Sequence, residues 1–400
     1  MQPAFELAAI LNRHWDQANE QLKLNSWQWR TLQAIRSCRT ASLGGHIDQC
    51  DHCGHLTISY NSCRNRHCPK CQGQQRETWM EARRAELLPV PYFHVVFTLP
   101  ETVNRLCLYK PAAVYNLLFS TAWSTIESFA ADERHLGAQT GMISILHTWG
   151  QTLSLHPHLH CIVPGGGITK SKHWRAGRSR GKFLFPVKAL SKVFRARFTA
   201  AVRKAFPDEP KEFFESLFKT NWVVYAKRPF GGPLQVIEYL GRYTHKIAIS
   251  NHRINALTKD TVSFTYRDYR QAGNRKEMTL AALEFIRRFA LHILPKGFVR
   301  IRHYGILSSK IKGEAIPIIR AQLIPWVPED PMIQGVTAAG IVTRTCPCCK
   351  KGMMQHLMDF DHRGPPAEYL KLIEKTQNNA ALQQGSLWIK ITKQPNKPLI

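Results

Sequence analysis

Leu155-His156-Pro157-His158-Leu159-His160-Cys161-Ile162-Val163 is the stretch that decides the fold of this 400-residue sequence. Residues two apart on a β-strand face the same side, so His158 and His160 are predicted to project together while Leu159 is buried on the opposite face. Two neighbouring imidazoles can share a divalent cation, and His156 could join them. The alternative is a pair of structural histidines.

Patterns on either side of this segment indicate an α+β fold. Residues 92–99 are a predicted strand that ends at Pro100, and residues 101–136 are predicted to be helical up to Gly137. Further predicted strands are 142–149, 222–226 and 262–267, with a helix at 234–243. Strands and helices without a regular βαβ period favour a central antiparallel sheet with flanking helices.

A pair of tyrosines follows in Glu238-Tyr239-Leu240-Gly241-Arg242-Tyr243-Thr244-His245-Lys246. Tyr239 and Tyr243 are one helical turn apart, so both hydroxyls would point to the same side. Phenol is a weak nucleophile at its ordinary pKa of about 10. A metal that polarises a phosphodiester, with Arg242 and Lys246 beside it, would help the attack. Without such a site, the pair would be ordinary packing.

The charge balance points to a polyanionic partner. The sequence has 55 Lys and Arg against 28 Asp and Glu, a net charge of +27, and neutralising phosphates releases their counterions. Twelve basic residues and no acidic one lie between Lys170 and Lys204, and the predicted DNA contacts among them are Arg178, Arg180 and Lys182. Five aromatic residues of this run could stack bases: Trp174, Phe183, Phe185, Phe194 and Phe198. The alternative is a solvated basic face.

The cysteines indicate metal binding. No segment is apolar enough to span a bilayer and no signal peptide is visible, so we expect a cytoplasmic protein without a membrane partner, in which disulfides are rare. Cys50-x-x-Cys53 and Cys68-x-x-Cys71 are two knuckles that would supply the four thiolates of a closed, structural zinc site. Four unligated buried thiols are the alternative.

Other cysteines and histidines could bind further zinc ions. A second site could be formed by Cys38, His46, Cys63 and His67, of which Cys63 and His67 have the i, i+4 spacing of a half-site. Near the C-terminus, Cys346-Pro347-Cys348-Cys349 is a third knuckle, which His356 and His362 could complete or which could be an orphaned half-ribbon. Basic residues of the N-terminal module are predicted to contact DNA: Arg64, Arg66 and Lys70.

Four domains are expected on these grounds. Residues 1–37 form a helical segment, 38–88 a zinc-ribbon-like domain that contacts DNA, and 90–310 the catalytic domain. Residues 311–400 form a tail of unassigned role that carries the third knuckle.

The order of these motifs resembles a known superfamily. A strand ending Phe97-Thr98-Leu99-Pro100, then His158-Leu159-His160, then Tyr239-Leu240-Gly241-Arg242-Tyr243, is similar to the three signatures of the HUH endonucleases. The cysteine module narrows the resemblance to the two-tyrosine rolling-circle transposases of bacterial insertion sequences, which are distantly similar to Helitron transposases. The resemblance covers roughly residues 30–310 and implies an HUH nuclease-like catalytic domain.

Roles for single residues follow from the resemblance. It implies that His158 and His160 hold Mg²⁺ or Mn²⁺ with a third polar ligand, for which we predict Gln151, with Glu238 and His147 as weaker candidates. Tyr239 and Tyr243 would be nucleophiles that form 5′-phosphotyrosine links, and Lys246 would stabilise phosphate charge.

The sequence therefore predicts a metal-dependent transposase that nicks and rejoins single-stranded DNA at transposon ends and targets. No Walker-type loop is present, so no ATP is expected to be used and a host helicase is the expected partner for unwinding. Such a protein would associate with the nucleoid when it is bound to DNA. The alternatives are a plasmid or phage replication initiator, a relaxase, and a non-enzymatic zinc-containing DNA-binding protein. The oligomeric state is open.

Overall fold

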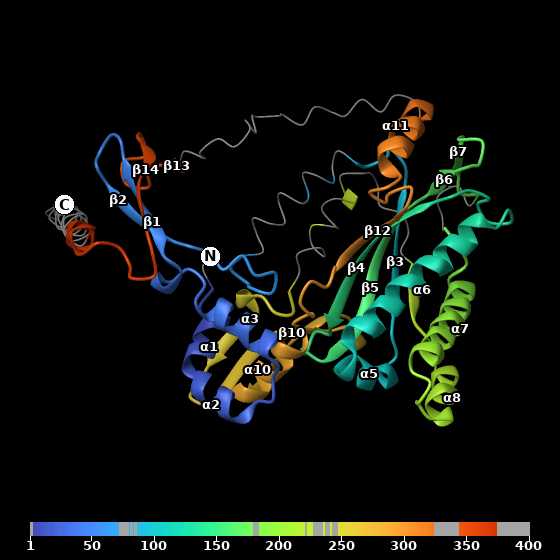
Figure 1. Ribbon diagram of the computed structural model, residues 1–400, viewed down its shortest axis with the longest axis horizontal. Helices are drawn as coiled ribbons and strands as arrows, with labels where there is room; N and C mark the ends of the chain where they lie inside the picture. Colours follow the sequence, from blue (N-terminus) through green and yellow to red (C-terminus); the bar gives the residue numbers. More distant parts are fainter. Residues whose placement is uncertain are drawn as a thin grey trace, which may run out of the picture. The chain divides into compact units, whose positions relative to one another are not determined.

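A five-stranded antiparallel sheet has the histidine strand at its centre (Figure 1). Its strand order is β12-β4-β5-β3-β8, with bounds β3 (Tyr92–Thr98), β4 (Gly141–Trp149), β5 (Leu155–Pro164), β8 (Val224–Ala226) and β12 (Ile301–Gly305). A small hairpin of β6 (Gly166–Ile168) and β7 (Trp174–Ala176) follows β5. The mixed α and β architecture with antiparallel sheets agrees with the sequence prediction.

This computed structural model describes residues 3–71, 80, 83, 86–178, 184–220, 222–226, 235–236, 241, 247–323 and 344–373. The chain divides into two compact units. The larger unit comprises Met1–Gln33 and Asn65–Glu329, and the smaller comprises Ala34–Arg64 and Asp330–Ile400. The smaller unit thus combines segments from opposite ends of the sequence.

One face of the five-stranded sheet is covered by helices (Figure 1). They are η2 (Glu101–Val103), α5 (Asn104–Tyr109), α6 (Pro111–Ala131), α7 (Val187–Ala205) and α8 (Lys211–Lys219). Pro111 begins α6 at the position where a missing N–H costs nothing. Leu159 of β5 is buried in this core with apolar side chains from the helices, as alternation along the strand predicted.

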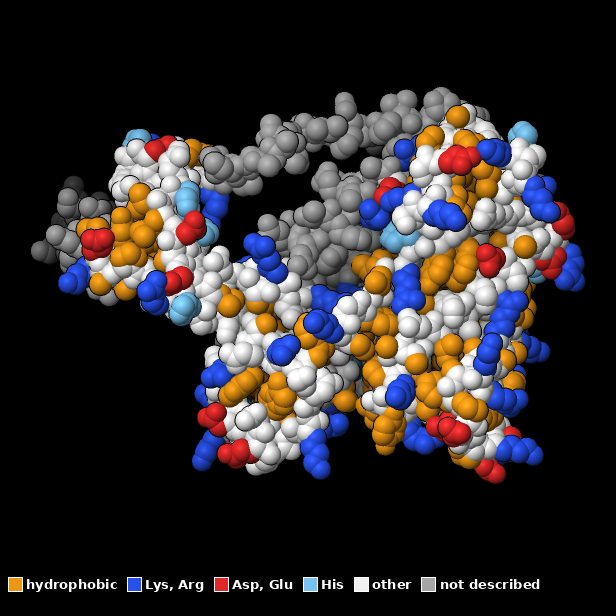
Figure 2. All heavy atoms as spheres, viewed as in Figure 1, with side chains coloured by type: hydrophobic (Ala, Val, Ile, Leu, Met, Phe, Trp, Pro, Cys, Tyr) orange, Lys and Arg blue, Asp and Glu red, His pale blue; other side chains and the backbone are white. Residues whose placement is uncertain are grey.

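The aromatic residues of α7 belong to this core. Leu190, Phe194, Phe198 and Val202 recur every fourth residue and are almost wholly buried, so they form the apolar stripe of an amphipathic helix. Phe185 is also buried. The prediction that these aromatics stack on bases is therefore wrong for Phe185, Phe194 and Phe198, while Phe183 lies outside the described residues. Figure 2 shows Lys and Arg side chains over the part of the surface occupied by α7.

The opposite face of the sheet has a second apolar cluster. Ile143 and Ile145 of β4 and Ile162 of β5 pack there with α11 (Lys312–Gln322) and with Val236. His158 and His160 are on the same side of β5 as Ile162, because they are spaced by two residues. The histidine pair thus lies on this second face.

A second sheet belongs to the larger unit. It has the order β11-β10-β9 and packs with α10. The N-terminal helices also contact it: the Arg13 guanidinium at the end of α1 donates to Thr258 O, between β9 and β10, at 2.9 Å. The elements are α1 (Leu7–Arg13), α2 (Trp15–Gln21), α3 (Ser26–Arg36), η3 (Asn251–Arg253), β9 (Ile254–Leu257), β10 (Thr261–Asp268), η4 (Tyr269–Gln271), β11 (Asn274–Ala281) and α10 (Ala282–Leu291).

The smaller unit contains a four-stranded antiparallel sheet in the order β13-β14-β1-β2. Its elements are η1 (Ala41–Leu43), β1 (Gly45–Cys50), β2 (Leu56–Tyr60), β13 (Arg344–Thr345) and β14 (Met353–Phe360). β14 pairs with the whole length of β1, from Gly45 opposite Phe360 to Cys50 opposite Met354. In the described part of the chain, no helix has both the length and the apolar character needed to cross a membrane.

Candidate functional site

Three histidines converge on the second face of the five-stranded sheet. His147 of β4 is directly opposite His158 of β5 in the strand register, and His160 follows two residues later. One ring nitrogen from each of the three lies within 4.8 Å of the others. The rings of His147 and His160 have centroids 4.6 Å apart, and those of His158 and His160 4.9 Å. This spacing suits three ligands of one metal ion.

Neighbouring groups orient two of these rings. Nδ1 of His160 is 2.9 Å from Nε2 of His94, a buried side chain on β3. Nδ1 of His158 donates to the backbone oxygen of His156 at 2.6 Å. When Nδ1 is held in this way, a histidine coordinates metal through Nε2, and such hydrogen bonds are usual around metal-binding histidines. The three residues therefore fit a divalent cation by arrangement and by chemistry.

The contacts of Gln151, the third ligand predicted from the sequence, are with two arginines. Its side-chain oxygen accepts from the backbone N–H of Arg267 at 3.5 Å, and its backbone oxygen accepts from the Arg253 guanidinium at 2.5 Å. Gln151 lies in the turn between β4 and β5, beyond the ladder, whereas His147 is within the ladder opposite His158. The register therefore favours His147, which the sequence analysis ranked below Gln151.

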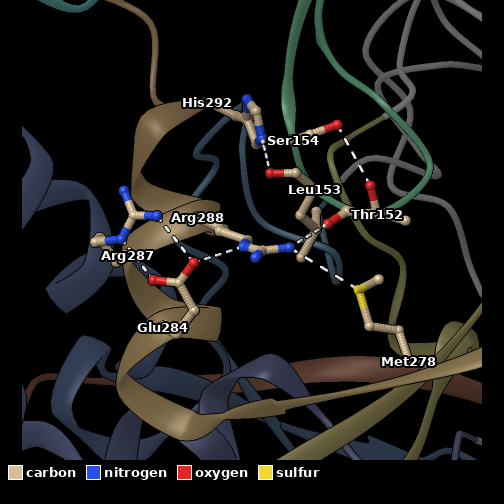
Figure 3. A network of polar contacts seen from close by, with 8 residues as sticks. All are labelled: Thr152, Leu153, Ser154, Met278, Glu284, Arg287, Arg288 and His292. Carbon is tan, nitrogen blue, oxygen red and sulfur yellow. Dashed lines mark hydrogen bonds and ion pairs between the residues drawn. The ribbon is translucent and has the colours of Figure 1, made fainter.

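The turn between β4 and β5 is held by α10 (Figure 3). Nε2 of His292 donates to Leu153 O at 3.1 Å, and the Arg288 guanidinium donates to Thr152 O at 3.2 Å. Leu153 is buried and has a positive φ of 59°, a conformation that costs free energy in a non-glycine residue. Burial lowers the pKa of His292 to about 4, so its ring is neutral in the folded protein.

Most of the tyrosine motif lies outside the described residues. Its members there include Glu238, Tyr239, Arg242, Tyr243 and Lys246. The structure does describe Val236, just before the motif, and Gly241 within it. Val236 is helical and wholly buried in the cluster that contains Ile143, Ile145 and Ile162. Gly241 is helical, and a Cβ atom there would collide with the Met80 thioether. Val236 thus lies on the same face of the sheet as the three histidines.

The cysteines are grouped differently from the sequence prediction. Sγ atoms of Cys50, Cys53, Cys346 and Cys349, all in the smaller unit, lie within 4.8 Å of one another. Cys68 and Cys71, which were expected to share one zinc with Cys50 and Cys53, are not in this group. Cys50 and Cys53 meet the C-terminal knuckle because β14 pairs with β1. Sequence spacing could not reveal a partner 293 residues away.

The histidines predicted for further zinc sites have other polar neighbours. Nε2 of His67 accepts from the backbone N–H of Leu294 at 3.3 Å, and burial lowers the pKa of His67 to about 3. His46 is 3.6 Å from the Asp48 carboxylate, and His356 is 3.4 Å from that of Asp359. His362 is absent from every group of potential ligands found among the described residues.

The residues predicted to contact DNA differ in their surroundings. The Arg66 guanidinium donates to Phe298 O at 2.5 Å and to Pro295 O at 3.1 Å, and burial lowers its pKa. Its contacts fit a structural role better than a DNA contact. Lys70 pairs with Glu6 at 2.7 Å, while Arg64 and Arg178 are exposed. Arg180 and Lys182 lie outside the described residues.

A basic hollow was missed by the sequence analysis. It has a volume of about 390 Å³ and is lined by Gln151, His252, Arg253, Thr265, Tyr266, Arg267, Tyr269 and Arg275. Arg267 of β10 and Arg275 of β11 are exposed and directly opposite each other. Like charges in such pairs are destabilising, so an anion would stabilise this arrangement. The pairing of β10 with β11 brings these two arginines together. Their spacing in the sequence does not by itself predict an anion-binding site.

Comparison with known proteins identifies the family. Residues 10–99 match the family described as "Transposase zinc-binding domain", of the IS91 type, and residues 141–315 match the one described as "Putative transposase". "Putative transposase y4qJ" of Sinorhizobium fredii (strain NBRC 101917 / NGR234) is 44% identical over 388 residues, which are 90% of this chain and 97% of that protein. The chain belongs to this transposase family.

A more distant relative is the transposase for insertion sequence element IS801 of Pseudomonas savastanoi pv. phaseolicola. It is 27% identical to this transposase over 328 residues, 76% of each chain. No solved structure matches the transposase. The three clustered histidines lie inside the matched range 141–315, whereas Cys346 and Cys349 lie outside both matched ranges.

Proposed function

We propose that this transposase cuts and rejoins single-stranded DNA through 5′-phosphotyrosine intermediates on Tyr239 and Tyr243, in rolling-circle transposition. The observation that carries the proposal is the set of three histidines, His147, His158 and His160, on the sheet face where Val236 packs. Val236 is three residues before Tyr239 in the sequence. The position of Val236 on the same face as the histidines supports the proposal that the tyrosines which follow it act beside the metal site.

In the proposed reaction, the phenol oxygen of one tyrosine attacks a backbone phosphorus. A tyrosine O–P bond forms, the bond from phosphorus to the 3′ oxygen breaks, and the 3′ oxygen leaves as a hydroxyl with the proton that the phenol gives up. The 5′ phosphate remains on the tyrosine. Attack by another 3′-hydroxyl reverses these steps and joins two strands, so the sequence of exchanges requires no ATP.

His147, His158 and His160 would hold Mg²⁺ or Mn²⁺ beside the phosphate. When bound, the cation would supply charge stabilisation for the phosphodiester oxygens. His94 and the backbone oxygen of His156 keep the rings of His160 and His158 in place. Lys246 would add a positive charge near the phosphate. Two tyrosines allow two cleavages in succession, one at the transposon end and one at the target.

The basic hollow at the turn between β4 and β5 supports a single-stranded DNA substrate. Arg267 and Arg275 would neutralise phosphates, and Tyr269, whose side chain is 72% exposed, could stack on a base. Gln151 lines the hollow and is four residues from His147 along the chain. Separation of the duplex would require a host helicase, because the sequence lacks a Walker-type loop.

A covalent adduct tests the proposal. The full-length protein, incubated with a single-stranded transposon-end oligonucleotide and Mg²⁺, should give a protein–DNA adduct that survives SDS. The double substitution Tyr239→Phe, Tyr243→Phe should abolish it, because no phenol oxygen remains at the site. Tyr109→Phe is the matched control, since Tyr109 is an exposed tyrosine on α5 and its loss should leave the adduct unchanged.

An adduct of undiminished yield in the double variant would disprove the nucleophile assignment. Tight DNA binding without any adduct in the unmodified protein would instead favour the non-enzymatic DNA-binding alternative.

A further inference from the structure

Two cysteine knuckles from opposite ends of the chain have matching backbone geometry. In Cys50–Cys53, the N–H of Gly54 donates to Cys50 O at 3.0 Å, and in Cys346–Cys349 the N–H of Lys350 donates to Cys346 O at 3.0 Å. The residue after each knuckle has a positive φ, 69° at Gly54 and 56° at Lys350. Both knuckles therefore make the same tight turn.

The four sulfur atoms have the spacing of a tetrahedral zinc site. Sγ of Cys50 is 3.7 Å from Sγ of Cys349, and Sγ of Cys53 is 3.8 Å from Sγ of Cys346. Two sulfurs bound tetrahedrally to zinc at about 2.3 Å lie about 3.8 Å apart. Disulfide sulfurs would lie about 2.05 Å apart, so these distances suit four ligands of one ion better than two disulfides.

Backbone N–H groups surround the sulfurs. The N–H groups of His52 and Cys53 point to Cys50 Sγ at 3.4 and 3.5 Å. In the other knuckle, Cys348 N–H points to Cys346 Sγ at 3.4 Å, and Gly352 N–H to Cys349 Sγ at 3.3 Å. Such donors stabilise thiolate charge, and a Cβ atom on Gly352 would lie only 2.6 Å from Cys50 Sγ. The close approach therefore requires glycine at 352.

We propose that Cys50, Cys53, Cys346 and Cys349 bind one Zn²⁺ as a closed tetrahedral site. The C-terminal hairpin β13–β14 is then half of a zinc ribbon whose other half is β1–β2. The matched zinc-binding family range ends at residue 99, so this ion extends the zinc-binding module to the C-terminal part of the chain. Cys68 and Cys71 are not part of this site.

Zinc content of purified full-length variants tests the proposal. Cys53→Ser and Cys346→Ser should each lose one equivalent of zinc relative to the unmodified protein. The double substitution Cys53→Ser, Cys346→Ser should lose no more than either single one, because both act on the same ion. Cys348→Ser is the matched control: Cys348 is exposed in the same knuckle, is not in the four-cysteine group, and its loss should leave the zinc content unchanged.

A second double variant separates this grouping from the simpler pairing of the two N-terminal knuckles. Cys53→Ser with Cys68→Ser should lose two equivalents, whereas a single shared site would lose one. Full zinc content in Cys346→Ser would overturn the proposal, as would a two-equivalent loss in Cys53→Ser, Cys346→Ser. Where Cys346→Ser is insoluble, zinc protection of Cys53 and Cys349 from alkylation, measured by mass spectrometry on the unmodified protein, gives the answer. Alkylation of both at the same rate with and without zinc would contradict the site. None of these outcomes depends on DNA cleavage.

Discussion

At the scale of single residues, the third ligand of the histidine site depends on strand register. His147 is opposite His158 in the β4–β5 ladder, and Gln151 is in the turn beyond it. His147→Ala should therefore lower the Mn²⁺ affinity by at least about 100-fold, more than losses of supporting hydrogen bonds usually cause. Gln151→Ala should leave it nearly unchanged. Calorimetric titration of the two variants with Mn²⁺ compares them, and the opposite ranking would favour Gln151 as the ligand.

At the scale of elements, α10 keeps the β4–β5 turn in place through a neutral histidine. Burial holds the pKa of His292 at about 4, against about 6.5 in the unfolded chain. Between these values only the unfolded chain takes up the proton, so acidification from pH 7 to pH 4 should lower the free energy of unfolding by up to about 3 kcal/mol through this residue.

His292→Gln tests that contribution, because an amide can still donate to Leu153 O but does not titrate. The unfolding free energy of this variant, measured by urea denaturation at several pH values, should fall less on acidification than that of the unmodified protein. His173→Gln, at an exposed position, should behave like the unmodified protein. Parallel pH curves for His292→Gln and the unmodified protein would show that His292 does not carry this acid sensitivity.

At the scale of the whole molecule, the charge of +27 predicts DNA binding that weakens with salt. Each phosphate contact on a single strand contributes about 0.7 to the slope of log affinity against log salt concentration. Arg267→Ala, Arg275→Ala should reduce that slope by about 1.4. Fluorescence anisotropy with a labelled single-stranded oligonucleotide measures it. Lys188→Ala, Lys192→Ala removes two exposed charges from α7 and should change the slope little; the reverse result would assign DNA binding to the α7 surface.

Much of the central sheet could be predicted from the sequence because its signals are local. Alternation in residues 155–163 was enough to place Leu159 in one core and His158 with His160 on the other face, since side chains along a strand alternate by geometry alone. The strands at 92–98 and 141–149 follow from their apolar runs. For α7, the run of positive charge suggested DNA binding. We overlooked the four-residue spacing of its apolar residues, which predicts that these side chains are buried in the core.

Taken alone, the sequence determined the kinds of chemistry that this transposase carries: paired histidines, paired tyrosines, thiolate knuckles and an excess of positive charge. Which residues act together was decided only by the tertiary structure. His147 joins His158 through the register of β4 and β5, and Cys346 and Cys349 join Cys50 and Cys53 through the pairing of β14 with β1. These contacts connect residues far apart in the chain, and their geometry is set by hydrogen bonding between strands, which no local spacing of residues encodes.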